Sequence, residues 1–389
     1  MCPLDRAIDL PSLHRWLEDR QPHWLEALAE LVRCESPSGD RAAITACARI
    51  ADRLFSSQAG TSSGRFLEAG GVPSLLMHWG CTESSSLLLL GHLDTVWDHG
   101  SFQPLFQVAG GRAQGPGVFD MKGGMVVALA ALAGLREFTG PEGNLTVLLT
   151  GDEEVGSAAS RELIETEAKR CSAVLVLEPP LGRAVKIARK GIGSYRLTVR
   201  GRAAHAGLDP ERGVNSLMAI APLVAEVASL ARSELGTSVS PTRLRAGTRT
   251  NVIPAEAQLD VDVRFATAVE ADRVDEGMRR LEVDLAEATL EVSGGANRPP
   301  FEHTSSSVMF AVAQKVAAQL GWAELEGASV GGGSDGNFTA ALGVPTLDGL
   351  GIVGGNAHAQ GEWADLSSIP DRAALLAGCL AELWSGGHS

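Results

Sequence analysis

Hydrophobic and polar positions follow two different patterns along the chain. In the first half, short apolar runs bounded by glycine and proline predict buried strands at residues 73–80, 85–92, 144–154 and 172–180. A 3.6-residue periodicity before and between these runs predicts helices at 41–54, 121–138 and 157–170, and at 11–33 with an interruption at Pro22. Strands that alternate with helices predict an α/β fold, in which helices cover both faces of a mainly parallel sheet.

A second pattern begins at residue 193, where apolar and polar residues alternate as they do in half-exposed strands. It predicts strands at 193–201, 242–247, 256–265 and 288–293, and helices near 213–232 and 269–287. Residues 294–302 have the composition of a return linker. After them the first pattern resumes, with helices at 306–320 and 371–384 and a short strand before 334–338. We therefore expect an α+β domain, residues 193–302, inserted into a larger domain formed by residues 1–192 and 303–389.

Composition and charge exclude several classes of partner. The 389 residues are 44% hydrophobic and 21% charged, as in ordinary globular proteins, and the net charge of −14 argues against a nucleic-acid partner. The longest aliphatic run, Leu87–Leu90, is far too short to span a membrane, and no signal peptide is evident at the N-terminus. Six scattered cysteines without a CxxC pair predict reduced thiols and a cytoplasmic location.

Acidic residues and histidines follow the predicted strands of the larger domain at the points where these strands end. His92 and Asp94 follow one strand, the run Asp152, Glu153 and Glu154 ends another, and Glu178 ends a further one. Asp120 and, much later, His358 lie in glycine-rich loops. Ligands of open α/β sheets bind at the carboxyl ends of the strands, so these side chains can converge.

Two histidines and three carboxylates suit a pair of divalent ions, with zinc the best candidate. Such a site needs a bridging carboxylate and one more acid that accepts a proton from water and returns it to the leaving amine. The adjacent Glu153 and Glu154 can divide the roles of base and ligand between them. Taken singly, each residue is more typical of a core histidine, a helix first turn or a surface turn. The joint pattern favours metal binding, because unpaired charges at strand ends are costly.

The motifs around these residues resemble the two-zinc aminoacylase/carboxypeptidase metallohydrolases. That family includes acetylornithine deacetylase, succinyl-diaminopimelate desuccinylase and the folate-cleaving glutamate carboxypeptidases. The resemblance covers nearly the whole chain. The matching motifs are GHLDTV (91–96), GPGVFDMKGG (115–124), TGDEEVGS (150–157), LEPP (177–180), GGGSDGNF (331–338) and NAHAQGEW (356–363). The resemblance implies a zinc exopeptidase-like sheet with an inserted lid and dimerisation domain.

The resemblance also implies a role for each metal-site residue. One zinc ion is expected on His92, Asp120 and Glu178, and a second on Asp120, Glu154 and His358, with Co²⁺ or Mn²⁺ as possible substitutes. Glu153 is expected to be the general base, and Asp94 to orient His92 from behind. The peptide bond between Asp120 and Met121 is expected to be cis.

Residues of the inserted domain match the family too. His205, in GRAAHAG, is expected to stabilise the oxyanion in the partner subunit of a homodimer. Asn251 and Arg264, in TRTNVIPAEAQLDVDVRF, and Arg298, in NRPPF, are expected to bind substrate. The loop at Gly333 is expected to offer backbone N–H groups to a substrate carboxylate.

The favoured function is zinc-dependent hydrolysis of an amide bond beside a free carboxylate, in a small peptide or N-acyl amino acid, with a glutamate carboxypeptidase as the preferred subclass. The alternatives are an N-acyl amino acid deacetylase, a dipeptidase and, more remotely, a non-catalytic binding protein that keeps the fold. The residue that would contact a glutamate side chain stays open among Arg183, Lys186, Arg189 and Lys190.

Overall fold

The computed structural model describes residues 8–80, 87–140 and 143–386, and these form two compact units. The large unit contains residues up to Ala188, His303–Ser329 and the residues from Ser334 onward. The small unit contains Arg189–Glu302 and Val330–Gly333. The start of the strand expected at 85–92, and two of the six cysteines, Cys2 and Cys81, lie outside the described residues.

The boundary between the units differs slightly from the expected one. Residues 189–192 belong to the small unit, because Arg189 pairs with Phe301 through two backbone hydrogen bonds of 2.9 and 3.0 Å. Residues 330–333 also join it, because Val330 accepts a hydrogen bond from the backbone N–H of Lys190 at 3.0 Å. These contacts join segments about 110 to 140 residues apart, so local periodicity carries no signal for them.

The large unit is built on one six-stranded sheet. The strand order is β1 (Arg65–Ala69), β2 (Val72–Gly80), β6 (Asn144–Thr150), β3 (Leu87–His92), β7 (Ala173–Val176) and β16 (Thr346–Leu347). The last four of these strands are mutually parallel, and β2 runs antiparallel to both of its neighbours. The expected α/β fold with a mainly parallel sheet is confirmed.

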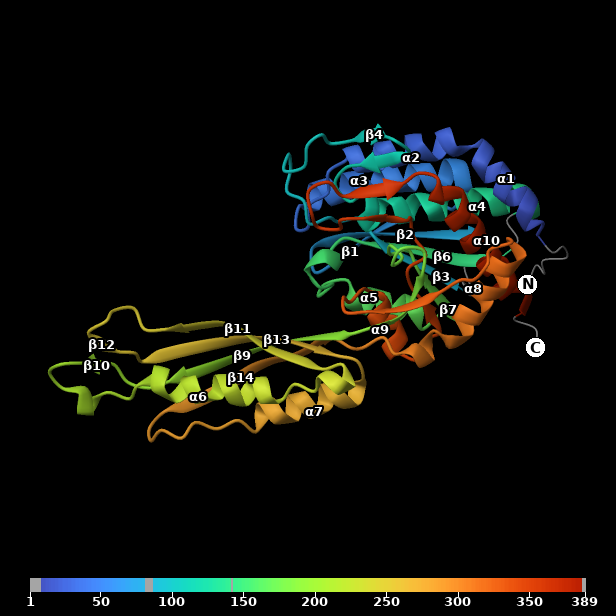
Figure 1. Cartoon of the computed structure of the whole chain (residues 1–389). Helices are drawn as coiled ribbons and strands as arrows, with labels where there is room; N and C mark the ends of the chain where they lie inside the picture. Colours follow the sequence, from blue (N-terminus) through green and yellow to red (C-terminus); the bar gives the residue numbers. More distant parts are fainter. Residues whose placement is uncertain (1–7, 81–86, 141–142, 387–389) are drawn as a thin grey trace. The chain divides into compact units, whose positions relative to one another are not determined.

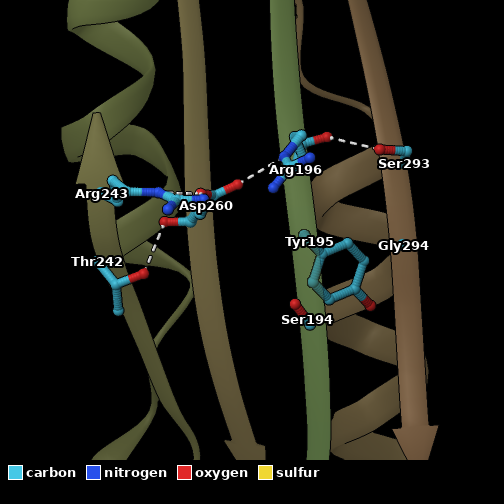
Figure 2. A pocket seen from close by; sticks show the side chains of 8 residues that line it. All are labelled: Ser194, Tyr195, Arg196, Thr242, Arg243, Asp260, Ser293 and Gly294. Carbon is cyan, nitrogen blue, oxygen red and sulfur yellow. Dashed lines mark hydrogen bonds and ion pairs between the residues drawn. The ribbon is translucent and has the colours of Figure 1, made fainter. Parts of the chain in front are cut away.

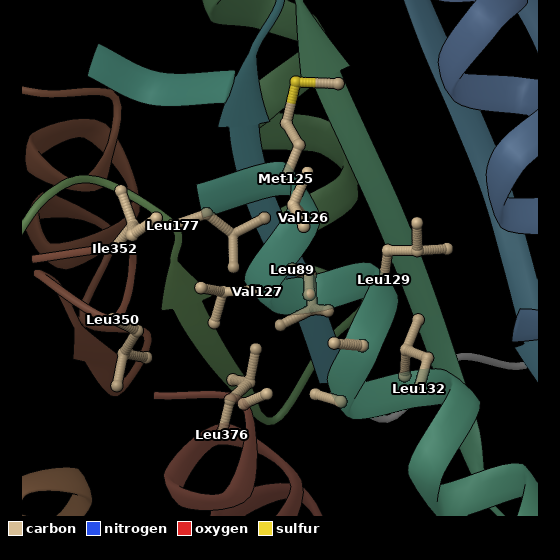
Figure 3. Packing of buried hydrophobic residues seen from close by; sticks show 14 of the residues in the cluster. Leu89, Met125, Val126, Val127, Leu129, Leu132, Leu177, Leu350, Ile352 and Leu376 are labelled. Carbon is tan, nitrogen blue, oxygen red and sulfur yellow. The ribbon is translucent and has the colours of Figure 1, made fainter. Parts of the chain in front are cut away.

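Strand β3 explains why four leucines stand in a row. Leu87 and Leu89 belong to the main core, whereas Leu88 and Leu90 belong to a second cluster on the other face of the sheet. Helices α4 (Gly123–Thr139) and α10 (Ser368–Gly386) contribute to the main core, and α5 (Arg161–Ala168) and α9 (Gly336–Ala341) to the second cluster (Figures 1 and 3). Because both faces are covered, the four positions from Leu87 to Leu90 are all apolar.

The other helices of the large unit are α1 (Leu10–Asp19), α2 (Gln21–Arg33), α3 (Arg41–Leu54) and α8 (Ser307–Gln319). The break at Pro22 is confirmed, since this proline lies in the first turn of α2. Helix α5 begins at Arg161 instead of 157, because Asp152 accepts hydrogen bonds from the backbone of Ala159 and Ser160 and holds the preceding residues in a loop. Among the described residues, one helical stretch, Val118–Thr139, is long and apolar enough to cross a membrane, but 89% of its most apolar window is buried in the core.

Several other strands carry too few residues to show a period. They are β4 (Gln107–Ala109), β5 (Arg112–Gln114), β17 (Gly354–Gly355) and β18 (Trp363–Asp365), which form a sheet in the order β17-β18-β5-β4, and the pair β8 (Val185–Arg189) with β15 (Gly327–Val330).

The small unit is a four-stranded antiparallel sheet with two helices on one face. The strand order is β11 (Ser238–Ala246), β13 (Glu256–Phe265), β9 (Gly191–Arg200) and β14 (Thr289–Arg298), and the helices are α6 (Ser216–Ser229) and α7 (Ala268–Arg279). Strand β14 extends through most of the expected linker, because residues up to Arg298 pair with β9. Helix α7 ends at Arg279, not near 287. A separate ribbon pairs β10 (Ala204–His205) with β12 (Val252–Ile253).

The face of this sheet opposite the helices carries a shallow pocket (Figure 2). Asp260 accepts hydrogen bonds from Arg196 at 2.7 Å and from Arg243 at 2.6 Å, so two guanidinium groups share one carboxylate. The other lining residues are Ser194, Tyr195, Thr242, Ser293 and Gly294. The pocket therefore contains none of the residues expected to bind substrate.

Candidate metal centre and active site

The parallel strands bring the expected ligands to one edge of the large sheet. In the register of the sheet, His92 at the end of β3 lies opposite Thr150, and Leu90 lies opposite Val176. Glu153 and Glu154 follow β6 after a short turn, and Glu178 follows β7 by two residues. The segments that carry them therefore leave the sheet at the same level.

Asp120 lies between the two histidines. Its Oδ1 is 3.4 Å from Nε2 of His92, and its Oδ2 is 3.2 Å from Nε2 of His358. Oε1 of Glu178 lies 3.5 Å from Nε2 of His92, and Oε2 of Glu154 lies 3.0 Å from Nε2 of His358. Each histidine thus faces one oxygen of Asp120 and one further carboxylate, which is the arrangement that two ions bridged by one carboxylate require.

Two buried atoms of this cluster have no hydrogen-bond partner within the described part of the chain. They are Nε2 of His92 and Oε1 of Glu154. Buried polar atoms are normally satisfied, so an imidazole nitrogen and a carboxylate oxygen that both lack a hydrogen-bond partner in one cluster are suited to bind a cation. Nitrogen and carboxylate donors are those that zinc accepts. The residues present therefore fit a divalent metal.

The charges of the cluster support the same conclusion. Burial alone would lower the pKa of His92, but the carboxylates around it outweigh this effect and hold its pKa well above the usual value. Asp120 and Glu154 raise the pKa of His358 to about 10. Burial opposes ionisation of Asp120, yet the two histidines lower its pKa far below the usual value. The carboxylates thus create a strongly negative site that attracts positive charge.

Asp94 organises the back of the site in more ways than expected. The nearer partner of His92 Nδ1 is the backbone carbonyl of Asp94 at 3.0 Å, and the carboxylate lies 3.4 Å away. The same carboxylate accepts hydrogen bonds from the backbone N–H groups of Glu153 and Glu154, both at 3.2 Å. Ser38, which the motifs did not single out, donates to it at 2.7 Å. Asp94 therefore ties the histidine strand to both glutamates.

Three further features of the large unit concern Asp120, Glu153 and His358. The peptide bond between Asp120 and Met121 is cis, as the family resemblance implied. A side-chain oxygen of Glu153 lies within 4.8 Å of ligand atoms of His92 and Glu178. His358 has a φ of 60° and is half exposed. It lies in a loop, so it is not marked in the sequence by the end of a strand.

Comparison with known proteins identifies the family. Residues 88–382 match the model of the family described as Peptidase family M20/M25/M40. The chain belongs to this family. Over 385 residues it is 33% identical to Carboxypeptidase G2 from Pseudomonas sp. (strain RS-16), covering 95% of this chain and 91% of that protein. It is 31% identical over 373 residues to succinyl-diaminopimelate desuccinylase from Halorhodospira halophila, covering 89% of this chain and 95% of that protein.

Solved structures agree with the family fold. Aminopeptidase PepT from Bacillus cereus superposes with a TM-score of 0.75 at 22% identity, over 93% of this chain and 98% of that one. A dinuclear metal binding peptidase of the M20 family from Bacillus subtilis gives a TM-score of 0.68 at 14% identity, over 95% and 99%. The predicted family is thus confirmed, and the chain is a metallohydrolase of the M20 type.

In the small unit of this M20 enzyme, His205 and Asn251 come together. The backbone N–H of Ala206 donates to the carbonyl oxygen of Asn251 at 3.0 Å. Nδ1 of the exposed His205 accepts hydrogen bonds from the backbone N–H groups of Gly207 at 3.1 Å and Leu208 at 3.2 Å. In the neutral ring the proton therefore lies on Nε2, which can donate a hydrogen bond outward.

The other expected substrate residues of the small unit gather around Ile192. Arg264 and Arg298 lie opposite Ile192 on its two sides, in strands β13 and β14. A Cβ added to Gly333 would lie 3.0 Å from the Ile192 side chain and 3.1 Å from that of Arg298. Arg298 is buried, and Arg264 pairs with Asp262 at 3.0 Å. The sheet and the adjacent loop at Gly333 thus bring together residues from three distant motifs.

Two of the four basic residues left open by the sequence have structural roles. Arg183 pairs with Asp371 at 2.7 Å and lies over the ring of Trp322. Arg189 is buried and donates to the carbonyl oxygens of Gly332 at 3.3 Å and Gly333 at 3.1 Å. Arg189 therefore holds the glycine-rich loop in place.

Proposed function

We propose that this enzyme is a zinc-dependent carboxypeptidase that releases a C-terminal glutamate, or a similar acidic amino acid, by hydrolysing its amide bond. The main observation in support is the position of Asp120 between His92 and His358, with the orphaned Nε2 atom of His92 beside it. The 33% identity to Carboxypeptidase G2 favours the carboxypeptidase subclass.

The proposed ligand sets are His92, Asp120 and Glu178 for one ion, and Asp120, Glu154 and His358 for the other. Zinc is the preferred ion, and Co²⁺ or Mn²⁺ can substitute for it. When bound, the ions would supply Lewis acidity that polarises the scissile carbonyl and makes water nucleophilic at neutral pH.

Glu153 is the proposed general base. It accepts a proton from the attacking water and then donates it to the nitrogen of the leaving amino acid. The amino acid therefore leaves as a neutral amine and not as a nitrogen anion. Asp94 supports this role, because its carboxylate holds the backbone N–H of Glu153 at 3.2 Å.

The proposed carboxylate site of the substrate consists of Arg298, Arg264 and the backbone of Gly333. Their clustering around Ile192 supports this assignment, since guanidinium groups bind carboxylates in bidentate fashion. Arg189 stabilises this site, because it donates hydrogen bonds to the carbonyl oxygens of Gly332 and Gly333 in the glycine-rich loop.

We further propose a cytoplasmic homodimer in which each active site receives His205 and Asn251 from the partner. Strand β11 is an edge strand, and the adjacent helix α6 exposes Leu217 and Met218, which favours two-fold pairing of small units. The outward Nε2–H of His205 suits it to stabilise an oxyanion. The described cysteines, Cys34, Cys47, Cys171 and Cys379, are free thiols, as a reducing compartment requires.

A substrate panel tests this function. We expect hydrolysis of hippuryl-glutamate or folyl-glutamate, abolished by chelation and restored by Zn²⁺, with Glu153→Gln as the inactive control. Faster cleavage of N-acetyl or N-succinyl amino acids would instead identify a deacylase, which the identity to the desuccinylases favours as second candidate. A metal-loaded protein that cleaves no amide would be a binding protein.

A further inference from the structure

Glu362 is a buried carboxylate with four hydrogen-bond donors. Its Oε1 accepts from the backbone N–H groups of Phe119 at 2.8 Å and Asp120 at 3.0 Å. Its Oε2 accepts from the backbone N–H of Gly117 at 3.1 Å and from the indole N–H of Trp97 at 2.9 Å. The residue is only 1% exposed, so water cannot replace these bonds.

These four bonds join three segments that each carry a proposed metal ligand. Trp97 follows His92 by five residues. Its ring packs edge-on against the ring of Phe102, with 4.9 Å between the two ring centroids. Glu362 itself follows His358 by four residues and directly precedes β18. The third segment is the loop of Asp120, where Glu362 binds the N–H of the bridging residue itself.

The geometry of Asp120 makes this junction important. The two oxygens of Asp120 point to different histidines, at 3.4 and 3.2 Å, so a small rotation of its backbone would weaken one contact as it shortened the other. Glu362 fixes the N–H of Asp120 and that of the residue before it. Outer carboxylates that orient metal ligands commonly change metal affinity or activity 10–100-fold when they are replaced.

We propose that Glu362 is a positioning residue for Asp120, and that it sets the separation of the two metal ions without contacting either. The proposal rests on the proposed two-metal function. A glutamate that only filled the core would be replaceable by glutamine at a cost in stability alone.

The test is Glu362→Gln, which keeps the shape but leaves one oxygen to serve the four donors. We expect the wild type to bind two Co²⁺ ions in a chelator competition. The variant should bind at least one of them about 10–100-fold more weakly, and its visible absorption spectrum should change. The matched control is Glu270→Gln in the small unit, where a buried glutamate bonds Thr237 and Arg273. This control should lose stability and keep both the affinity and the spectrum.

A second variant keeps the proposal testable if Glu362→Gln does not fold. Trp97→Phe removes one donor and preserves the ring contact, so it should weaken Co²⁺ binding in the same direction, by a few-fold. If the folded variants bind both ions as tightly as the wild type, with an unchanged spectrum, the positioning role is wrong and the proposed function stands. If the wild type itself binds no divalent ion, the metal function fails, and the inference fails with it.

Discussion

Replacement of Asp94 by asparagine tests how the site holds its two glutamates. The carboxylate uses Oδ1 for the N–H of Glu153 and Oδ2 for the N–H of Glu154, both at 3.2 Å. It also accepts from Ser38 at 2.7 Å. Asparagine has one carbonyl oxygen, so one backbone N–H must face an NH₂ group and lose its acceptor.

The magnitude follows from these bonds. A hydrogen bond to a charged group contributes about 1.5–3 kcal/mol, and a neutral one roughly half of that. Asp94→Asn removes one charged bond and neutralises the other two, so the total loss is about 3–6 kcal/mol. Part of this loss lowers the free energy of unfolding. The rest is the energy that holds Glu153 and Glu154 in their positions at the site. We expect metal affinity to fall about 10–100-fold and kcat to fall further, because the base is released.

The assay combines chelator competition, kcat on a glutamyl substrate and denaturant unfolding of the metal-free protein. Asp152→Asn is the matched control, because the buried Asp152 carboxylate likewise accepts two backbone N–H groups and one hydroxyl, but from Ala159 and Ser160. The control should lose less stability, because both N–H groups bind the same oxygen, Oδ2, and can keep the carbonyl oxygen of asparagine, and its metal affinity should change much less. An Asp94→Asn variant with metal affinity and kcat within about threefold of the wild type, well inside the 10–100-fold range, would refute the reasoning.

Three further outcomes are expected. Glu153→Gln should keep both metal ions and lose about 10²–10⁴-fold in kcat, whereas Glu154→Gln should also lose metal in a direct metal analysis; equal metal content in the two variants would reassign their roles. Mixing His205→Ala with Glu153→Gln subunits should restore activity toward half of the wild-type value per mixed dimer, and no recovery after proven exchange would contradict sharing between subunits. Glu270→Gln should destabilise the small unit by at most about 3 kcal/mol at neutral pH, since Arg273 lowers the pKa of Glu270 to about 2. Because this pKa is lower in the folded than in the unfolded protein, the difference should be full above about pH 5 and vanish as the pH falls toward 2; a difference in unfolding free energy that does not change with pH would contradict the ion pair.

The sequence by itself determined those features that depend on local burial. Strand β3 was predictable because the leucines on both of its sides must be apolar when both faces of the sheet are covered. His92 and Glu178 followed, since parallel strands end at one edge of the sheet. His358 lies in a loop, and only the motif around it indicated its role.

Only the tertiary structure decided which distant groups share a hydrogen bond. Asp94 holds backbone groups of residues 59 and 60 positions away, and Glu362 holds that of Asp120, 242 positions away. The end of β14 was likewise decided by its pairing with β9, although its glycines suggested a linker. Periodicity reports which face of an element is buried, but not which partner lies there. Those partners depend on how the elements pack, and the packing orients the ligands that the sequence could only name.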